Sequence, residues 1–516
     1  MAIVTKSLKL SCLAVMLAAL CSCASVDFNY PKTVSTAPTD TEDTHLGKQI
    51  VGLAEKHPGQ AGFYPQRNGI KALAARLLLA ERAERTIDAQ YYLLTDDTVG
   101  YAFLDSLLRA ADRGVRVRLL LDDMFTQGYD PGLAALDSHP NFEVRIFNPF
   151  ARRSARFMDV ATSFSRINRR MHNKSFTVDN QMTIIGGRNI ANEYFGVNPD
   201  KKFGDLDVVA LGPVVAEVSA MFDEYWNHKA AAPIPAFAKI PKDPAASLLT
   251  LRSRIEQSRE DIQGTPYAAA VNMQVLDYVE SGAELYTWAP YTLAYDSPDK
   301  VQKDLAKNAP SIMTPLRDYL NGAQQEILIV SPYFVPPKSS IEWFVKMEER
   351  GVDITILTNS LAANNQLLVH GGYASTRKPL LKGGVRIYEV RPDAMVRGAH
   401  IVGAHSATAT LHTKAFVVDR HDLFIGSFNY DPRSAFINTE LGVVIESPEL
   451  AEPLVERLYE VAPTQAYEVF LNEQGKLRWR TLENGEEVVF DREPETAWWQ
   501  RFAAGFFGLL PINSQL

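Results

Sequence analysis

Apolar residues recur along the chain at spacings that alternate between those of helices and those of strands. Residues 70–78 carry them at helical intervals, and residues 87–94 then form a short strand-like run. A second helix is predicted over 99–113, ends at Gly114, and is followed by the apolar strand VRVRLLLDD. Helices and strands that alternate in this order predict an α/β fold with mostly parallel sheets.

The second half of the chain repeats this pattern. The segment MTPLRDYLNGAQQEILIVSPYFV predicts a helix and then a strand, and SIEWFVKMEERGVDITILTN does so again, with Gly351 between the two elements. We therefore expect two homologous α/β halves, over 61–235 and 301–465. A Pro-rich and partly helical linker is expected over 236–300, and a C-terminal extension over 466–516.

The N-terminus has the layout of a secretory signal peptide over residues 1–22. Lys6 and Lys9 flank an apolar run, Leu10–Leu20, that is short for a membrane-spanning helix. The segment Leu-Cys-Ser-Cys that follows resembles a bacterial lipobox, in which Cys23 is the better lipidation site because the bulky Leu20 directly precedes Cys21.

Lipidation of Cys23 would make the mature protein a membrane-anchored lipoprotein. Residues 23–60 are rich in Pro, Ser and Thr and are expected to form a tether. Ala24 follows the cysteine, which favours the outer over the inner membrane on the periplasmic side. Cys12, Cys21 and Cys23 are the three cysteines of the chain, so disulfides and thiol chemistry are not expected in the mature protein.

Composition narrows the classes of partner. The chain is 46% hydrophobic and 22% charged, with a formal net charge of -8. This composition is typical of a globular protein, and the chain lacks the net positive charge of a typical nucleic-acid binder. We expect no nucleic-acid partner, and no protein partner can be named.

One motif occurs twice, 240 residues apart, with its internal intervals kept. MHNKSFTVDNQMTIIGGRN and LHTKAFVVDRHDLFIGSFN share the pattern His-x-Lys-x4-Asp-x6-Gly-small-x-Asn. Alternation along a strand places the His and the Lys on one face. The small residues at 186–187 and 426–427 would let a backbone approach a ligand closely. An imidazole, an ammonium and a carboxamide at one place suit a phosphoryl group.

The paired motifs resemble those of the phospholipase D superfamily, in which two such motifs meet at a pseudo-twofold axis and form one active site. The resemblance covers nearly all of the mature chain. Four segments are similar in sequence to bacterial C-type cardiolipin synthases: IDAQYYLLTDD, LLRAADRGVRVRLLLDD, VHGGYASTRKPLLKGGVRIYE and LLPINSQL. The implied fold is therefore a pair of phospholipase D-like α/β sandwich halves with one shared site.

The resemblance implies a ping-pong reaction at a phosphodiester. It assigns His172 as the nucleophile and His412 as the general acid and base, although the reverse assignment stays open. The expected donors to the phosphoryl oxygens are Lys174, Lys414, Asn189 and Asn429, with help from Ser427 where the first half has Gly187. Asp179 and Asp419 are expected to be structural.

Each catalytic His needs a carboxylate that holds one tautomer. TELGVVIESP aligns with GDLDVVALGP, which pairs Glu440 with Asp205, and family members use such acids to hydrogen-bond the His of the opposite half. Asp207 lies on the same strand face as Asp205 and competes for the role.

No metal or other cofactor is expected. His400, His405 and His412 lie close enough in sequence to suggest zinc, but no cysteine and no His-Glu-x-x-His motif supports such a site.

Two surfaces are candidates for lipid contact. The stretch ARRSARFMDVATSFSRINRR could collect anionic headgroups or be a solvated basic loop, and its apolar residues favour membrane contact. The aromatic C-terminal segment ETAWWQRFAAGFFGLLPINSQL could be an interfacial helix or a helix that covers the core of the second half. Both interpretations of each segment stay open.

The leading hypothesis is a phosphatidyltransferase that makes cardiolipin from phosphatidylglycerol and a second phospholipid, whether anionic or zwitterionic. Phospholipid hydrolysis by the same residues is the alternative. A nucleic-acid phosphodiesterase fits the charge and the signal peptide less well, and a catalytically silent adaptor fits poorly with two intact motifs.

Overall fold

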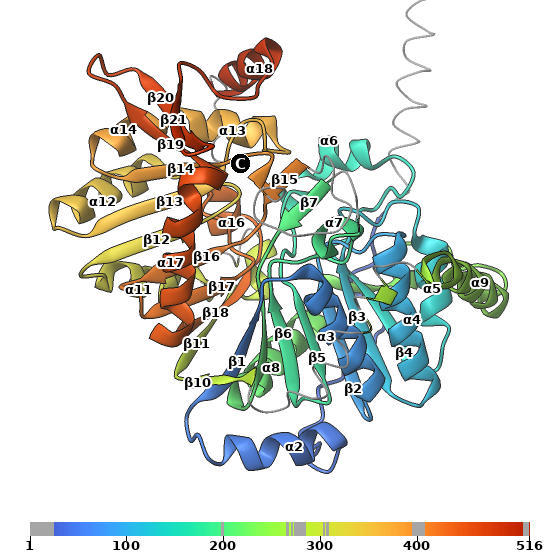
Figure 1. Ribbon diagram of the computed structural model, residues 1–516. Helices are drawn as coiled ribbons and strands as arrows, with labels where there is room; N and C mark the ends of the chain where they lie inside the picture. Colours follow the sequence, from blue (N-terminus) through green and yellow to red (C-terminus); the bar gives the residue numbers. More distant parts are fainter. Residues whose placement is uncertain are drawn as a thin grey trace, which may run out of the picture.

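The computed structural model describes residues 25–197, 201–264, 268–269, 272, 285–302, 305, 309–394, 408–508 and 515. Two α/β halves lie side by side, with the first half on the right of Figure 1 and the second on the left.

In the described residues the first half is built on a nine-stranded sheet of order β10-β1-β8-β6-β5-β2-β3-β4-β9. The strands are β1 (Ala61–Gln66), β2 (Thr86–Tyr91), β3 (Arg116–Asp122), β4 (Phe142–Phe147), β5 (Ser175–Val178), β6 (Met182–Gly186), β8 (Asp207–Leu211), β9 (Ala231–Pro233) and β10 (Thr287–Ala289). The helices are α2 (His45–Ala54), α3 (Gly69–Arg82), α4 (Thr98–Asp112), α5 (Asp130–Asp137), α6 (Arg156–Ile167), α7 (Asn192–Phe195), α8 (Pro213–Asn227) and α9 (Pro244–Ile262).

The second half is built on a ten-stranded sheet of order β11-β18-β17-β16-β12-β13-β14-β19-β20-β21, again within the described residues. Its strands are β11 (Tyr291–Tyr295), β12 (Glu326–Val330), β13 (Asp353–Asn359), β14 (Arg386–Val390), β16 (Ala415–Val418), β17 (Asp422–Gly426), β18 (Leu441–Glu446), β19 (Ala466–Leu471), β20 (Leu477–Glu483) and β21 (Glu486–Phe490). Its helices are α11 (Met313–Gly322), α12 (Lys338–Glu349), α13 (Leu367–Ala374), α14 (Arg377–Lys382), α16 (Pro432–Phe436), α17 (Pro448–Gln465) and α18 (Trp498–Gly508).

The expectation of mostly parallel sheets is wrong, because both sheets are mixed. Parallel pairing joins β2 to β3 to β4 and β12 to β13 to β14, as the helix-strand pattern predicts. The motif strands instead form antiparallel hairpins, β5 with β6 and β16 with β17. β5 and β16 also pair antiparallel with the neighbouring strands β2 and β12.

The repeat begins earlier in the second half than expected. β11 pairs with β18 as β1 pairs with β8, so the second half starts at Tyr291 rather than at residue 301. β10 belongs to the first sheet and is separated from β11 by Pro290 alone. The last residues of the expected linker are therefore strands of the two sheets, whereas α9 confirms its helical part.

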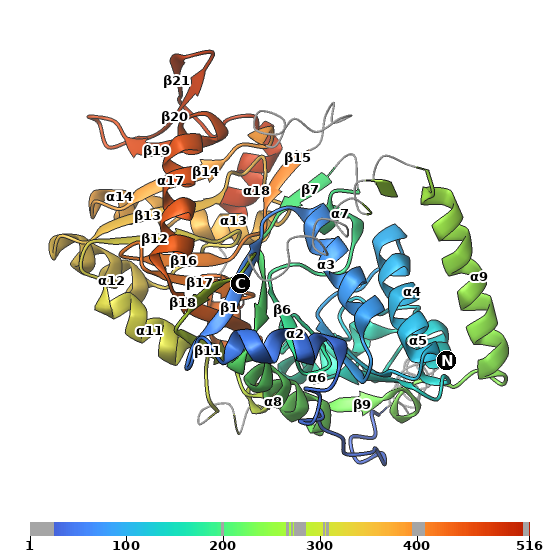
Figure 2. The same cartoon turned by 60° about the horizontal axis from the view of Figure 1, so that its bottom comes forward.

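Residues 25–60 do not form a free tether. Lys32 Nζ donates to the backbone oxygen of Ala231 at 2.8 Å, and Arg118 donates to the backbone oxygen of Ser35 at 2.9 Å. The helix α2 follows, buries Leu46 and Ile50, and runs across the front of Figure 2. This segment is fixed to the first half by buried polar contacts that its composition does not reveal.

A continuous apolar core joins the two halves. Val218 and Phe222 of α8, which belong to the first half, lie in one buried cluster with Val417 and Leu441 of the second. Each half also has a core of its own on the outer side of its sheet. The halves therefore form one body.

The C-terminal extension continues the second half. β19 pairs antiparallel with β14 and is followed by β20 and β21. Helix α18 then packs against α13. Among the helices of the described residues, none has both the length and the apolar character needed to cross a bilayer.

Candidate active site

Both His-x-Lys segments are extended and lead directly into a central strand. His172 and Lys174 precede β5, and His412 and Lys414 precede β16. All four side chains are buried, but the imidazoles keep 8% and 6% of their surface exposed, so small parts of them remain accessible. Asn173, between the first pair, accepts a hydrogen bond from Thr439 Oγ1 at 2.7 Å.

Each motif histidine is held by the backbone of the other half. The His172 amide donates to Thr439 O at 2.9 Å, and the His412 amide donates to Gly204 O at 2.8 Å. Just before His412, the short strands β7 (Lys201–Gly204) and β15 (Thr408–Leu411) pair in parallel across the junction of the halves. They lie between the two halves in Figure 1.

Each histidine also bonds to a carboxylate of the other half. His172 Nδ1 lies 2.8 Å from Glu440 Oε2, and His412 Nδ1 lies 2.6 Å from Asp205 Oδ2. Each Nδ1–H thus donates to a carboxylate and leaves Nε2 available to a reacting group. The structure therefore places Glu440 and Asp205 at equivalent positions, each beside the motif histidine of the opposite half, as the resemblance implies.

The competing acid, Asp207, has different partners. Its Oδ2 lies 2.8 Å from Arg76 and 3.3 Å from Arg188, and all three side chains are buried. Asp207 therefore neutralises two buried guanidinium groups behind the site and does not contact a histidine.

The two lysines lie beside the histidines. Lys174 Nζ donates to His172 O and Lys414 Nζ to His412 O, each at 2.5 Å. Burial lowers the pKa of Lys174 to about 7 and that of Lys414 to about 8, although nearby carboxylates oppose the shift.

The two His-carboxylate pairs differ in electrostatics. Burial raises the pKa of Glu440 to about 7, whereas His412 and Lys414 outweigh the burial of Asp205 and lower its pKa. Burial and the lysines lower the pKa of His412 to about 3 and that of His172 well below its usual value. Both imidazoles are therefore neutral in the free site at pH 7.

The motif asparagines each have an unpaired acceptor. Asn189 Nδ2 lies 3.0 Å from the Tyr194 hydroxyl, and Asn429 Nδ2 lies 3.5 Å from Ser434 Oγ, but both Oδ1 atoms are buried without a partner. A hydroxyl can donate as well as accept, so the reversed amide keeps the bond and turns Nδ2 to the unpaired side. In that orientation each amide can donate to a substrate oxygen.

The small motif residues make room for the carboxylates rather than for a ligand. A Cβ on Gly187 would lie 2.2 Å from Asp205 Oδ1. Its counterpart Ser427 donates to Glu440 Oε2 at 2.5 Å and accepts from the Leu441 amide. The expectation that Ser427 assists the phosphoryl donors is thus replaced by a contact that orients Glu440.

Asp179 and Asp419 lie at the far end of the motif strands. Asp179 Oδ1 accepts from the amides of Arg85 and Thr86, and Asp419 Oδ1 accepts from those of Gln325 and Glu326, at 2.7 to 2.9 Å. Each carboxylate therefore caps the start of the strand beside its motif, β2 or β12.

Several residues near the histidines escaped the sequence analysis. The Tyr92 ring lies edge-on to His172 at 4.9 Å, and Tyr194 lies edge-on to His412 at 5.0 Å. Phe203 stacks on His412 at 5.3 Å. The cation of Arg433, which donates to Asn168 O, contributes to the lowered pKa of His172. Of these residues, only Tyr92 gave a signal in the sequence, because Tyr92 and Tyr333 lie 80 and 79 residues before the two motif histidines.

The basic stretch before the first motif is not a solvated loop, because its arginines bind groups of the protein itself. Arg153 and Arg156 bind Asp123, Arg152 binds Asp159, and Arg170 binds Asp122. Arg166 and Arg169 donate mainly to backbone oxygens. Most of these guanidinium groups therefore hold the first half together, and Arg169 binds it to the second half.

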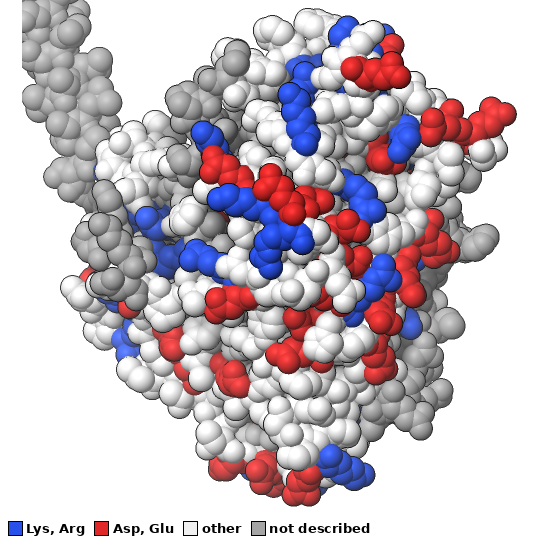
Figure 3. All heavy atoms as spheres, turned by 90° about the vertical axis from the view of Figure 1, so that its left-hand side faces the viewer, with Lys and Arg blue, Asp and Glu red and all other residues white. Residues whose placement is uncertain are grey.

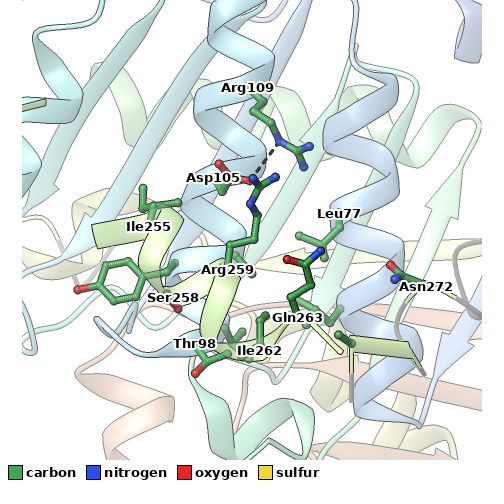
Figure 4. A pocket seen from close by; sticks show the side chains of 15 residues that line it. Leu77, Thr98, Asp105, Arg109, Ile255, Ser258, Arg259, Ile262, Gln263 and Asn272 are labelled. Atoms are coloured by element: carbon green, nitrogen blue, oxygen red, sulfur yellow. Dashed lines mark ion pairs between the residues drawn. The ribbon is translucent and has the colours of Figure 1, made fainter. Parts of the chain in front are cut away.

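A separate pocket of about 420 Å³ lies between α3, α4 and α9 (Figure 4). Leu73, Val99 and Ile255 line it, and the ion pair of Asp105 with Arg109 borders it at 3.2 Å. None of the motif residues lines this pocket.

No three His, Cys, Asp or Glu residues of the described segments are grouped to hold a metal ion. His400 and His405, which with His412 would form a zinc site, lie outside the described residues.

Comparison with known proteins places these motifs in a family. The model of the cardiolipin synthase, PLD-like domain matches residues 78–226 and 316–461, one match in each half. The chain belongs to this family.

Relatives extend the likeness to nearly the whole chain. The chain is 40% identical to cardiolipin synthase C of Escherichia coli K12 over 473 residues, which are 91% of this chain and 99% of the relative. It is 31% identical to an uncharacterized protein of Helicobacter pylori 26695, over 95% of this chain and 96% of that one. Phosphatidylserine synthase of Haemophilus influenzae has the same fold, with a TM-score of 0.57 at 14% identity over 91% of this chain and 99% of that one.

Proposed function

We propose that the protein is a phosphatidyltransferase that makes cardiolipin from phosphatidylglycerol and a second phospholipid, through a phosphohistidine intermediate. The observation that carries the proposal is the pair of His-carboxylate contacts, His172 with Glu440 and His412 with Asp205, each made across the two halves. The 40% identity to a cardiolipin synthase supports the choice of lipid.

In the first step, Nε2 of His172 attacks the phosphorus of the donor lipid. His412 has by then taken up a proton from solvent on Nε2, because the bound anionic phosphodiester raises its pKa. The bond from phosphorus to the leaving alcohol breaks, and the alcohol oxygen takes this proton from His412 Nε2. In the second step, the acceptor hydroxyl gives its proton to His412 and attacks phosphorus. The P–N bond then breaks, and both histidines return to their starting state.

The difference between the two pairs supports this assignment of roles. The pKa of His172 is held well below its usual value, and the pKa of its partner Glu440 is raised. The imidazole of His172 therefore stays neutral, as a nucleophile must. His412 faces Asp205, whose lowered pKa keeps it ionised and suited to stabilise an imidazolium. The bound phosphodiester adds a negative charge that raises the pKa of His412 towards the value an acid needs.

The remaining polar groups would stabilise the pentavalent transition state. Lys174 and Lys414 bring ammonium groups from both halves, and Asn189 and Asn429 bring amide donors. Preorganised donors in a buried site act strongly on developing charge because little water screens them.

We further propose that the protein acts at a membrane as a lipoprotein anchored through Cys23, on the periplasmic side and in the outer membrane. The signal-like N-terminus and the lipobox-like segment support this location. On the face of the second half shown in Figure 3, acidic and basic side chains are interspersed, which does not favour a nucleic-acid substrate.

The test is mass spectrometry of lipids after incubation of the detergent-solubilised protein with phosphatidylglycerol, with and without phosphatidylethanolamine. Cardiolipin should form, and its formation should be lost in His172→Ala and in His412→Ala. His421→Ala, an exposed histidine paired with Asp422, is the matched control and should keep activity. Phosphatidic acid as the sole product would mean a hydrolase, and the absence of both lipids would redirect the search to nucleic-acid phosphodiesters.

A further inference from the structure

Helix α6 turns its apolar face to solvent. Phe157, Val160 and Phe164 are 75%, 46% and 50% exposed. Phe157 and Val160 are spaced to lie on one side of the helix, and Phe164 follows a kink at Ser163. The opposite side buries Asp159, which accepts from the amide and guanidinium of Arg152. This is the reverse of the usual arrangement, in which the apolar stripe of a helix faces the core.

Helix α18 is arranged in the same way. Trp498, Phe502 and Phe506 lie on one side and are 73%, 69% and 53% exposed. The buried side carries Ala504, which packs on α13 so closely that a Cβ on Gly371 would lie 2.7 Å from Ala504 O. The helix thus docks through its smallest side chains and leaves its largest ones exposed. The sequence interpretation of a docking helix therefore describes its buried side, and its exposed side has the aromatic composition of an interfacial helix.

Both helices lie along the upper edge of Figure 1, and contacts between chain segments connect them. Gln515, which follows α18, accepts from Asn168 Nδ2 at 2.8 Å, and Asn168 is the C-cap of α6. Arg433 of α16 donates to both residues, and Phe436 on the same helix is 65% exposed.

This edge adjoins the candidate active site. Asn168 lies four residues before His172, and the charge of Arg433 reaches that histidine. The edge also adjoins the start of the described chain, because the Phe28 ring lies 5.5 Å from the guanidinium of Arg166 on α6. Cys23 lies five residues before Phe28, and five residues span at most about 18 Å.

We propose that the exposed faces of α6 and α18, together with the exposed Phe436, form a docking surface for a lipid bilayer. We call it the aromatic edge. Exposed apolar surface of this extent marks a binding site on a globular protein, and Trp and Phe on an amphipathic helix insert at the boundary of headgroups and acyl chains. The choice of a bilayer as partner rests on the proposed function, because a lipid substrate and a lipid anchor place the site at a membrane.

Tryptophan fluorescence can test this contact directly. The full chain carrying His172→Ala is placed on vesicles of phosphatidylglycerol and phosphatidylethanolamine with brominated acyl chains, which quench tryptophans that enter the bilayer. The chain has six tryptophans, of which Trp226 and Trp479 are buried. Quenching should occur and should be lost in the conservative variant W498F/W499F. Persistent quenching in that variant would overturn the role of α18.

The same background tests α6 with one added tryptophan. Phe157→Trp should restore quenching, whereas Lys48→Trp, on the exposed side of α2 at the opposite edge of Figure 1, should not. Equal quenching of both variants, or of neither, would overturn the proposal. Dimerisation in solution that depends on Phe157 and Phe502, without quenching, would assign the surface to a second copy instead.

Because the protein is inactive in this assay, its outcome does not depend on turnover. Failure of cardiolipin synthesis in the wild-type chain would refute the proposed function and leave the quenching result standing. Loss of quenching with intact synthesis from short-chain lipids in detergent would refute the aromatic edge alone.

Discussion

The imidazole of His172 and the carboxylate of Glu440 lie 268 residues apart in sequence and 2.8 Å apart in space, and each belongs to a different half of the protein. The same relationship holds for His412 and Asp205. Neither half on its own supplies both a motif histidine and the carboxylate that orients it.

Glu440→Gln should lower kcat by between about 10²- and 10⁴-fold, because the amide cannot stabilise the tautomer that leaves Nε2 free to attack. Cardiolipin formation followed by mass spectrometry measures the effect. Glu446→Gln is the control, since Glu446 ends the same strand and binds Tyr319 rather than a histidine. Equal losses in both variants would contradict the role of Glu440.

Asp205→Asn and Asp207→Asn should separate catalysis from stability. Asp205→Asn should abolish most activity and leave the melting temperature nearly unchanged. Asp207→Asn should destabilise the fold by about 3–5 kcal/mol, because it removes the carboxylate that neutralises the buried Arg76. Calorimetry and activity per folded molecule distinguish the two, and a reversed result would make Asp207 the orienting acid.

Gly187→Ala and Ser427→Ala occupy equivalent positions and should differ in effect. The added Cβ at residue 187 would lie 2.2 Å from Asp205 Oδ1 and must displace that carboxylate from His412, so activity should be lost. Ser427→Ala removes one donor to Glu440 and should cost about tenfold, from roughly 1.5 kcal/mol for a hydrogen bond to a charged group. Similar rates in the two variants would refute this account of the asymmetry.

Asp179→Ala should lower stability without changing the chemistry. The side chain satisfies backbone amides of Glu84, Arg85 and Thr86, and unpaired buried amides cost about 1–3 kcal/mol each. Asp419→Ala should lower stability by less, because two of the three amides that Asp419 binds, those of Gln324 and Gln325, are exposed. Denaturant unfolding measures both, and an unchanged midpoint would contradict the structural role.

The pH dependence of kcat/KM should form a narrow bell. As pH falls through about 7, Glu440 gains a proton and no longer holds His172. As pH rises through about 7 to 8, Lys174 and Lys414 lose the charge that binds the phosphodiester. These groups titrate together, so the two limbs belong to the cluster rather than to single residues. Glu440→Gln should lose the acid limb, and a flat wild-type profile from pH 6 to 9 would contradict this scheme.

Most of the site could be predicted from the sequence because its groups lie at fixed intervals in a repeat. Strand alternation places His172 beside Lys174, and the second copy locates His412 and Lys414 in the same way. The pairing of Glu440 and Asp205 with the motif histidines could be predicted only from the resemblance to a family. No local sequence pattern indicates which half supplies the acid that orients each histidine.

Other features depend on contacts between distant segments and escaped the sequence. Arg153 looks like a free cation until Asp123, thirty residues earlier, is seen to pair with it. Thr287–Ala289 and Tyr291–Tyr295 are short strands whose partners lie far away in the chain. Residues 25–60 look like a tether because buried polar anchors such as Lys32 leave no periodic signal.

The path of the chain through Pro290 has a consequence for turnover. β10 completes one sheet and β11 starts the other after a single residue, while one apolar core fills the space between the sheets. Such a joint leaves no hinge by which the halves could separate and close again. Lipids must therefore enter and leave a site that is already assembled, and the slow step of the cycle should be local diffusion or chemistry rather than the opening of two lobes.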